Sequence, residues 1–367
     1  MSKLLKEEIS KQNIKKLTGL IKNIKPDFDA LSFEHSVLDE QWVNLALKQR
    51  IRKLSEQLQV YLSCSYLESL NILKAVSVEF SGLFHFIFAD YVELYGLNDF
   101  ESSMQALALF TKNSTAEFAI RAFLTKEPEK TKQQLLIWSK SNNEHLRRLA
   151  SEGVRPRLPW AGHLNWIAEN PEWVRPILEN LHSDGSRYVQ KSVANLLNDL
   201  SKSQEQWVLE LLETWLTHNS PSNETKWIVK HALRTLLKRG NAKALALMGY
   251  GSIEHITLNE WQLDKNVQIG EVLNGQFIIT SQQKLGVLRL EYALWFLRKS
   301  QSPYRKVFKL AESCYNSDCK AFNLRHNFKL ISTRHYLPGL HKIELIINGQ
   351  TMHSSMFELQ QSITNQS

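Results

Sequence analysis

Residues 186–202, SRYVQKSVANLLNDLSK, predict a single amphipathic helix. Its apolar residues follow the i, i+3, i+4, i+7 spacing that places side chains on one helical face, and they are Val189, Val193, Leu196, Leu197 and Leu200. Ser186 precedes the first turn and is the expected N-cap. Because the apolar face must be covered, we expect this helix to pack against others of the same kind.

The same spacing recurs along the chain as far as about residue 250. It predicts further helices at Glu40–Leu62, Tyr66–Phe80, Asp99–Thr111, Pro128–Ser141, Gln204–His218 and Asn223–Arg239. Pro128 and Pro171 fall where a helix could begin, since the first turn tolerates proline.

Three basic segments of these helices resemble one another: EHLRRLA (144–150), RYVQKSVA (187–194) and KWIVKHA (226–232). Leu146, Val189 and Ile228 occupy comparable places, at intervals of roughly 40 residues, which is near the period of HEAT-type helix pairs. We therefore expect a mainly α, HEAT-like α-α superhelical repeat domain over residues 1–250, with one concave wall.

The pattern changes near Gly249–Gly251, and period-2 alternation then predicts strands. The expected strands are Ile253–Leu258, Gln276–Thr280, Gly286–Leu297, Lys306–Leu310, Asn323–Ile331, His341–Ile347 and Gln350–Leu359, with a two-residue hairpin turn at Asn348-Gly349. Short strands in this number predict a small all-β immunoglobulin-like sandwich over residues 253–367.

The chain carries 45 Lys+Arg against 37 Asp+Glu, a formal charge of +8, and residues 253–367 hold half of the excess. This balance favours a polyanionic partner. The cysteines are Cys64, Cys314 and Cys319, an odd number without zinc-ligand spacing, so we expect neither a disulfide framework nor a metal site. The N-terminus does not read as a signal peptide, and no apolar run reaches the length of a membrane span. We expect a cytoplasmic monomer without a cofactor.

The most unusual segment is Asn143–Trp166, NEHLRRLASEGVRPRLPWAGHLNW. It begins as a helix and should end at Gly153. The basic, proline-rich run that follows predicts a stiff loop that holds Trp160 in place.

Four segments carry a family resemblance: STAEFAIRAFL (114–124), RRLASEGVRPRLPWA (147–161), RYVQKSVANLLNDLSK (187–202) and IELIINGQ (343–350). They resemble the AlkC family of alkylation-repair DNA glycosylases, relatives of AlkD in the HEAT-like DNA glycosylase superfamily, and span essentially the whole chain. The resemblance implies a monofunctional glycosylase (a hydrolase) that removes 3-methyladenine and 3-methylcytosine from double-stranded DNA in base excision repair. It also implies excision without flipping the base, unlike most enzymes that act on bases.

The chemistry of such bases indicates which residues to look for. A base methylated at N3 is already cationic, so it leaves as a neutral molecule without a general acid. The enzyme must stabilise an oxocarbenium-like sugar and place a water, and a carboxylate can do both.

Glu152 is the first candidate, because a carboxylate is disfavoured at the C-terminal end of a helix. From position alone, an i, i+4 pair with Arg148 would explain it. The resemblance instead makes Glu152 a catalytic carboxylate and Arg148 a nearby active-site group. The resemblance places a second carboxylate at Glu117, which could equally be the N3 residue of a capping box that begins at Ser114.

Trp160 could pack in a core, but its Arg/Pro surroundings favour a rim position where the indole meets deoxyribose or a cation. The resemblance also implies an aromatic residue beside the lesion. Asp199 matches a motif position without an assigned role. Candidate phosphate contacts, each of which could equally be part of a solvated basic face, are Arg155, Arg157, Lys191, Lys226 and Lys230.

Two alternatives to the glycosylase stay open. A HEAT-type array can serve as a non-catalytic adaptor that binds nucleic acid or protein. An RNA-binding scaffold would carry a similar basic wall. Both would bind without releasing a base.

Overall fold

The computed structural model describes residues 5–217, 220–298, 302–330 and 335–361. The chain forms two compact units, residues 1–232 and 233–367. The domain limits that the sequence predicts, 1–250 and 253–367, remain a proposal. Among the described residues, no helix has the length and apolarity needed to cross a membrane.

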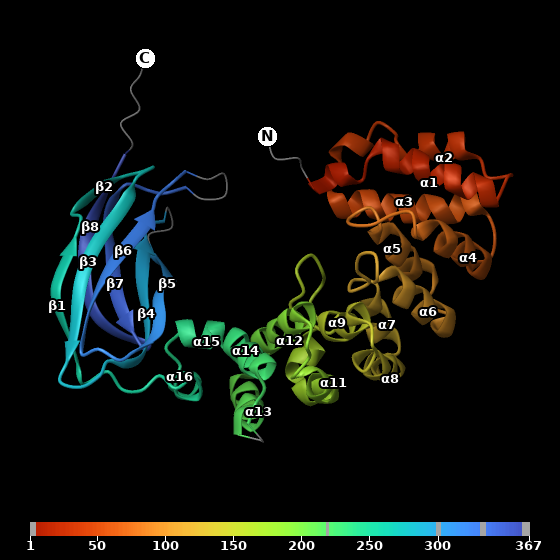
Figure 1. Ribbon diagram of the computed structural model, residues 1–367. Helices are drawn as coiled ribbons and strands as arrows, with labels where there is room; N and C mark the ends of the chain where they lie inside the picture. The colour runs from red at the N-terminus through yellow and green to blue at the C-terminus, as the bar shows by residue number, and fades with distance from the viewer. Residues whose placement is uncertain (1–4, 218–219, 299–301, 331–334, 362–367) are drawn as a thin grey trace, which may run out of the picture. The chain divides into compact units, whose positions relative to one another are not determined.

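The first unit is helical (Figure 1). Its elements are η1 (Leu5–Glu8), α1 (Lys11–Ile24), α2 (Ala30–Val37), η2 (Trp42–Asn44), α3 (Leu47–Leu62), α4 (Tyr66–Ser77), α5 (Phe86–Tyr95), α6 (Phe100–Phe110), α7 (Ile120–Lys126), α8 (Pro128–Ser139), α9 (Glu144–Glu152), α10 (Asn165–Glu169), η3 (Pro171–Val174), α11 (Arg175–Leu181), α12 (Arg187–Leu200), α13 (Glu205–Thr217) and α14 (Asn223–Ala232). Pro128 and Pro171 each open a helical segment, as expected.

The predicted repeat corresponds to three helices packed in succession. The similar segments lie on α9, α12 and α14, and α12 contacts both of the others. Val189 and Ile228 are completely buried at matching positions, whereas Leu146 is half-buried. Because each helix covers the apolar face of the next, the residues at any one position of the repeat form a row across the array.

Most predicted helices agree with the structure to within a few residues. The prediction of one long helix at Asn223–Arg239 is wrong, because the helix is interrupted at Leu233 and divides into α14 and α15 (Arg234–Lys238). The predicted helix Glu40–Leu62 starts late, at Leu47, after the short turn η2. The expected end of another helix, at His218, lies outside the described residues.

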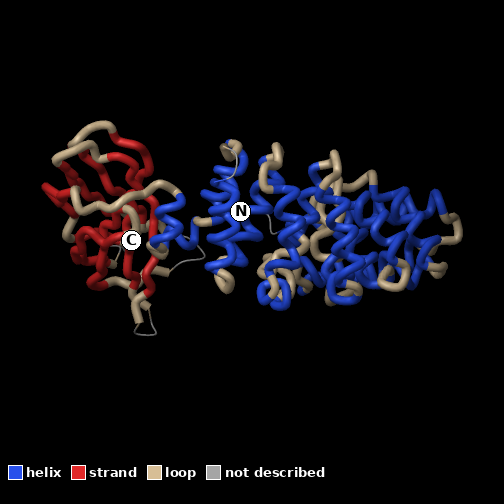
Figure 2. The backbone as a smooth tube through the Cα atoms, turned by 90° about the horizontal axis from the view of Figure 1, so that it is seen from below, coloured by secondary structure: helices blue, strands red, loops and turns tan. Residues whose placement is uncertain are grey.

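The second unit begins with α15 and α16 (Ala242–Leu247) and continues as a two-sheet β structure, which contains all the strands that the described residues form (Figure 2). One sheet has the order β1-β3-β6 and the other β2-β8-β7-β4-β5. The strands are β1 (Ile256–Leu263), β2 (Asn266–Gln268), β3 (Val272–Ser281), β4 (Gly286–Phe296), β5 (Tyr304–Tyr315), β6 (Cys319–Asn327), β7 (Gly339–Ile347) and β8 (Gln350–Gln360). Pairing is antiparallel except between β2 and β8.

The predicted strands correspond to β1 and β3–β8, so an immunoglobulin-like sandwich is confirmed in outline. Sequence reasoning missed β2, whose short parallel pairing with β8 leaves little alternation to detect. It placed β1 too early, at Ile253, and one predicted end, Ile331, lies outside the described residues. The three cysteines are unpaired.

The β7–β8 hairpin has the predicted two-residue turn. Asn348 and Gly349 both have positive φ, 44° and 78°, as a type I′ turn requires. Gly349 also lies against the α15–α16 turn: a Cβ there would come within 2.6 Å of Leu245 and 2.8 Å of Gly240. The glycine thus serves both the backbone conformation and the packing of the short helices on the hairpin.

Replacing Gly349 by alanine should therefore destabilise the second unit more than positive φ alone would. Gly286→Ala is the matched control, because Gly286 has a similar φ of 72° with nothing within 4 Å of a built Cβ. We expect about 1 kcal/mol for the control and roughly 2–4 kcal/mol for Gly349→Ala, from strain plus overpacking. Urea unfolding of the full chain measures both, and equal losses would contradict the packing argument.

Candidate active site

Six charged side chains of alternating sign form a row of ion pairs, and they come from the segment before α7, from α9 and from α12 together with the residues that follow these two helices. We call this set the charge chain; its members, in order, are Glu117, Arg148, Glu152, Arg155, Asp199 and Lys202. Every member except Lys202 has a side chain no more than 13% exposed. Charges this deep are tolerated because each has an opposite neighbour.

Glu152 lies at the centre of the charge chain. Its Oε1 accepts a hydrogen bond from Nη1 of Arg155 at 2.6 Å and lies 3.6 Å from Nη2 of Arg148. The i, i+4 partner expected from the sequence is therefore the more distant of the two arginines. Two guanidinium groups therefore face this carboxylate, of whose side chain only 8% is exposed.

Asp199 now has a structural assignment. Its Oδ2 accepts from Nε of Arg155 at 2.9 Å, and its Oδ1 accepts from Nζ of Lys202 at 3.1 Å. Arg155 thus joins the carboxylates of Glu152 and Asp199, and these partners raise its pKa despite the opposing effect of burial. Asp199 orients the arginine that in turn holds Glu152.

Glu117 does not form the expected capping box. Helix α7 begins later, at Ile120, and the Ser114 hydroxyl donates instead to the carbonyl of Gly82. The Glu117 carboxylate accepts from the Thr115 hydroxyl at 2.8 Å and pairs with Arg148, which also donates to Thr115 Oγ1. The carboxylate is therefore turned away from a helix terminus and joined to the charge chain.

Close contacts between helices bring these side chains together. The Ser151 hydroxyl donates to that of Ser192 at 2.7 Å, so α9 lies directly against α12 at Glu152. Helix α9 ends at Glu152, as expected, but Gly153 has an ordinary φ of −61°. A Cβ on Gly153 would lie 2.5 Å from Ile120, so glycine is needed there for the close approach of α7.

Trp160 lies on the loop between α9 and α10, and the residue is 54% exposed rather than packed in the core. Its φ is +65°, a left-handed conformation that is unfavourable for a bulky residue. Nζ of Lys48 donates to the Trp160 carbonyl at 2.9 Å. The loop therefore presents an aromatic face to solvent in a strained backbone conformation that other groups must stabilise.

Arg121 is a residue that sequence reasoning did not single out. It is 7% exposed, and its guanidinium donates to the carbonyls of Gly153 and Arg155 at 3.1 and 2.8 Å, and to that of Gly162. Burial, with a contribution from the charge of Arg155, lowers the pKa of Arg121 to about 10. A lone charge within the apolar run IRAFL was the available signal.

An aromatic and basic ladder runs along the repeat beside the charge chain. The guanidinium of Arg148 lies 5.2 Å from the ring centroid of Tyr188, and that of Arg187 lies 4.1 Å from the ring of Trp227. His145 meets Tyr188 edge-on, with centroids 5.7 Å apart. These cation–π contacts add to the packing of α9 on α12 and of α12 on α14.

The predicted phosphate contacts divide into two groups. Arg157, Lys191, Lys226 and Lys230 are exposed, and Lys191 and Lys230 occupy the same position of the repeat as Arg148. Arg155 is only 8% exposed and bonded to two carboxylates. The two carboxylates engage its Nε and Nη1, so a phosphate contact by Arg155 would have to use the remaining N–H groups of a buried guanidinium.

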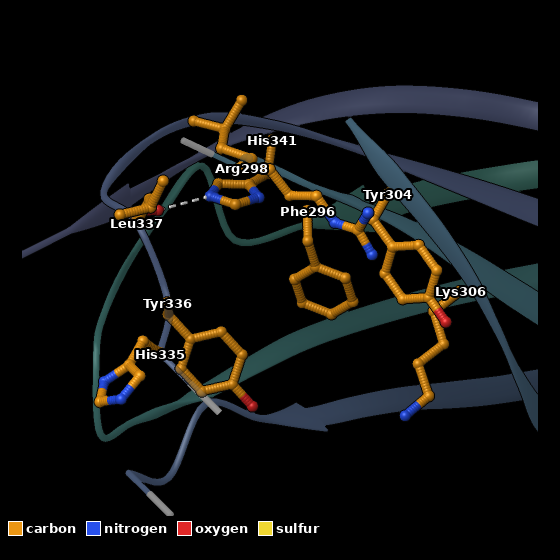
Figure 3. Close-up of a pocket in the computed structure, with 9 residues that line it drawn as sticks. Phe296, Arg298, Tyr304, Lys306, His335, Tyr336, Leu337 and His341 are labelled. Carbon is orange, nitrogen blue, oxygen red and sulfur yellow. Dashed lines mark hydrogen bonds between the residues drawn. The ribbon is translucent and has the colours of Figure 1, made fainter. Parts of the chain in front are cut away.

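The second unit holds a cavity of about 250 Å³ where β4 ends and β5 begins (Figure 3). The rings of Phe296 and Tyr336 face it, and the guanidinium of Arg298 lies 4.2 Å from the ring centroid of Tyr304. Lys306 also lines the cavity, and no described lining residue is acidic. Such a cavity favours anionic or aromatic groups.

Comparison with known proteins matches both parts of the chain. Residues 105–236 match the family model described as DNA alkylation repair enzyme, which covers α7, α9 and α12 and therefore the whole charge chain. Residues 257–361 match the model described as the C-terminal Ig-like domain of the uncharacterised protein YhaZ, which covers most of the strands.

Two whole-length relatives extend these matches. The uncharacterised protein YhaZ of Bacillus subtilis is 41% identical over 358 residues, covering 97% of this chain and 99% of that protein. The structure of the alkylpurine DNA glycosylase AlkC of Pseudomonas fluorescens, bound to DNA with an abasic-site analogue, is 35% identical with a TM-score of 0.92, covering 98% of this chain and all of that one. The chain belongs to the AlkC family of DNA alkylation-repair glycosylases.

Asp199→Asn tests the charge chain as a structural unit. It removes one of the two carboxylates bonded to Arg155, and the loss of this buried, charge-assisted hydrogen bond should cost about 1–3 kcal/mol of unfolding free energy. The matched control is Asp27→Asn, which removes one carboxylate from an exposed pair with Lys25 and should leave the urea midpoint unchanged. If the urea midpoints of both variants equal that of wild type, the charge chain adds nothing to the stability of the protein.

Proposed function

We propose that this protein hydrolyses the N-glycosidic bond of cationic 3-methyladenine and 3-methylcytosine in double-stranded DNA, as a monofunctional glycosylase that acts as a monomer. The observation that carries the proposal is the charge chain, with the carboxylate of Glu152 at its centre, next to the loop that exposes Trp160. The family membership, and a relative with DNA bound, support DNA as the partner.

The reaction needs no acid on the leaving group. The C1′–N bond breaks with its electron pair going to the base nitrogen, which neutralises the positive charge of the methylated base. The deoxyribose becomes an oxocarbenium-like cation. Water then adds at C1′, and its proton passes to a carboxylate and on to solvent. The sugar product is an abasic site, and the strand stays intact.

Glu152 is suited to oppose the developing cation. The hydrogen bond from Arg155 and the contact with Arg148 both involve Oε1 of Glu152. We therefore assign the other oxygen, Oε2, to the sugar and the attacking water. Only 8% of the Glu152 side chain is exposed, and a fixed negative charge in such a buried position is more effective against the cation than the same charge in bulk solvent. Arg148 and Arg155 orient the carboxylate without neutralising it by proton transfer.

We assign the remaining site residues around Glu152. Glu117 is the second carboxylate, and its proximity to Arg148 lets it share the electrostatic stabilisation and accept the proton of the water. The exposed indole of Trp160 packs against the deoxyribose or the charged base. Arg157, Lys191, Lys226 and Lys230 contact phosphates along the duplex.

The loop that carries Trp160 suggests how the enzyme recognises the methylated base. The exposed aromatic face belongs to a loop held by side chains of α3 and α7, and we propose that it meets the nucleotide at the duplex surface. Recognition then depends on the charge of the base and on backbone shape, without extrusion of the base.

Base release from methylated duplex tests the function directly. Wild-type protein should liberate free 3-methyladenine and 3-methylcytosine, detected by chromatography. It should leave abasic sites that break only after alkaline treatment. Breaks before that treatment would contradict hydrolysis without strand cleavage. DNA binding without any release would instead indicate the non-catalytic adaptor.

Glu152→Gln should lower the single-turnover rate by about 10²–10³-fold, the scale for removing one preorganised electrostatic group. Affinity for DNA with an abasic-site analogue should stay within a few-fold of wild type. Glu172→Gln is the matched control, because Glu172 forms an exposed pair with Arg175. A wild-type rate for Glu152→Gln would remove Glu152 from the mechanism.

The cavity of the second unit yields a separate prediction for DNA affinity. We propose that Arg298 and Lys306 contact the phosphate backbone, so replacing both by alanine should reduce the salt dependence of binding by about 1–2 in the slope of log K against log salt. The single-turnover rate at saturating protein should not change. The double variant Lys265→Ala/Lys284→Ala removes equal charge from other exposed positions of this unit. A similar loss of slope in both would remove the cavity from the interface.

A further inference from the structure

Arg121 makes an unusual set of contacts for a buried cation. Its three hydrogen bonds all go to main-chain carbonyls, two at the start of the α9–α10 loop (Gly153 and Arg155) and one near its end (Gly162). Among the described residues, no carboxylate forms an ion pair with it. One planar guanidinium therefore joins two parts of a loop that are separated in the sequence.

This arrangement is costly for the fold. The lowered pKa of Arg121 means that burial disfavours its charge more than its surroundings favour it, and the side chain is nevertheless cationic at neutral pH. Stability alone would be served as well by an apolar residue with a rearranged loop. All three acceptors of Arg121 are main-chain carbonyls of this loop, so its hydrogen bonds act on the geometry of the loop.

The loop that Arg121 closes is under strain. Trp160 keeps its left-handed backbone conformation between the two parts of the loop that Arg121 holds, and Lys48 binds the Trp160 carbonyl from α3. The Lys48 ammonium also lies 4.8 Å from the ring centroid of Phe118, which limits its motion. Without these ties the backbone of Trp160 would relax to an ordinary conformation, and the indole would change direction.

Arg121 is also joined to the carboxylate side of the site. Two of its acceptors, the carbonyls of Gly153 and Arg155, belong to the residues on either side of Val154, directly after Glu152. The side chain of that same Arg155 holds Glu152 Oε1. A shift of this segment would therefore move the carboxylate and the loop together.

We propose that Arg121, assisted by Lys48, is a positioning residue for base excision: it fixes the indole of Trp160 relative to the carboxylate of Glu152. The inference rests on the proposed glycosylase function. Arg121 touches neither sugar nor base, and it acts through the two groups that do.

Arg121→Lys is the central variant, because it keeps the charge while an ammonium cannot bridge three carbonyls in a plane. Arg50→Lys is the matched control: Arg50 is 3% exposed, donates to the carbonyl of Lys6 and packs on Trp42, with no contact to the loop. Lys48→Met serves as a second variant from an exposed position, so its folding is not at risk.

Two measurements separate positioning from a purely structural role. The first is the single-turnover rate at saturating protein, below the melting temperature of each variant, together with affinity for duplex with an abasic-site analogue. The second is ¹⁹F NMR of protein labelled with 5-fluorotryptophan, in which the Trp160 resonance among the ten tryptophans is assigned through Trp160→Phe.

For Arg121→Lys we expect a rate about 10- to 100-fold lower, the scale of an ångström-sized misplacement, with affinity within a few-fold of wild type. The Trp160 resonance should shift or broaden. Lys48→Met should move the same resonance with a smaller loss of rate. Arg50→Lys should lower the melting temperature and leave both the rate and the resonance as in wild type.

A wild-type rate in Arg121→Lys overturns the proposal, as does an unmoved Trp160 resonance in both loop variants. Should Arg121→Lys fail to fold, Lys48→Met decides by the same two criteria. If wild-type protein releases no base, the proposed function fails, whereas the NMR comparison still reports whether Arg121 fixes the loop.

Discussion

The alternation of charge from Glu117 to Lys202 is the constraint on which the rest of this structure depends. A carboxylate that opposes a cation inside a helical array is buried there, and fixed opposite charges beside it offset the cost of that burial. The helix pairs supply those charges from successive repeats. Packing of α9 on α12 is thus also the assembly of the site.

The same requirement accounts for local features that would otherwise look unfavourable. Glu152 occupies the C-terminal end of a helix, which disfavours an anion, because the neighbouring arginines are reached from there. Gly153 brings α7 close enough for Arg121 to bind the loop. Trp160 is held in a strained conformation by groups from two other helices.

The architecture could be predicted from the sequence because the spacing of apolar residues indicates which positions are buried, as Val189 and Ile228 show. The Asn348-Gly349 turn could be predicted because these residue types favour positive φ. Sequence reasoning selected Glu152, Glu117 and Trp160 mainly through family resemblance. It could not tell that Arg155 is buried between two carboxylates, since the partner Asp199 comes from another repeat. Ion pairs between repeats, and hydrogen bonds from Arg121 to main-chain carbonyls, join residues that are far apart in the sequence and therefore leave no local sequence pattern.

A double-mutant cycle on the single-turnover rate of base release tests the central claim most directly, using Asp199→Asn, Glu152→Gln and their combination. If Asp199 acts by orienting Arg155 against Glu152, the Asp199 substitution slows release strongly when Glu152 is present and adds almost nothing once Glu152 is glutamine. If the rate loss of the double variant equals the product of the two single losses, the two carboxylates act independently. That result would contradict the charge chain as one functional unit.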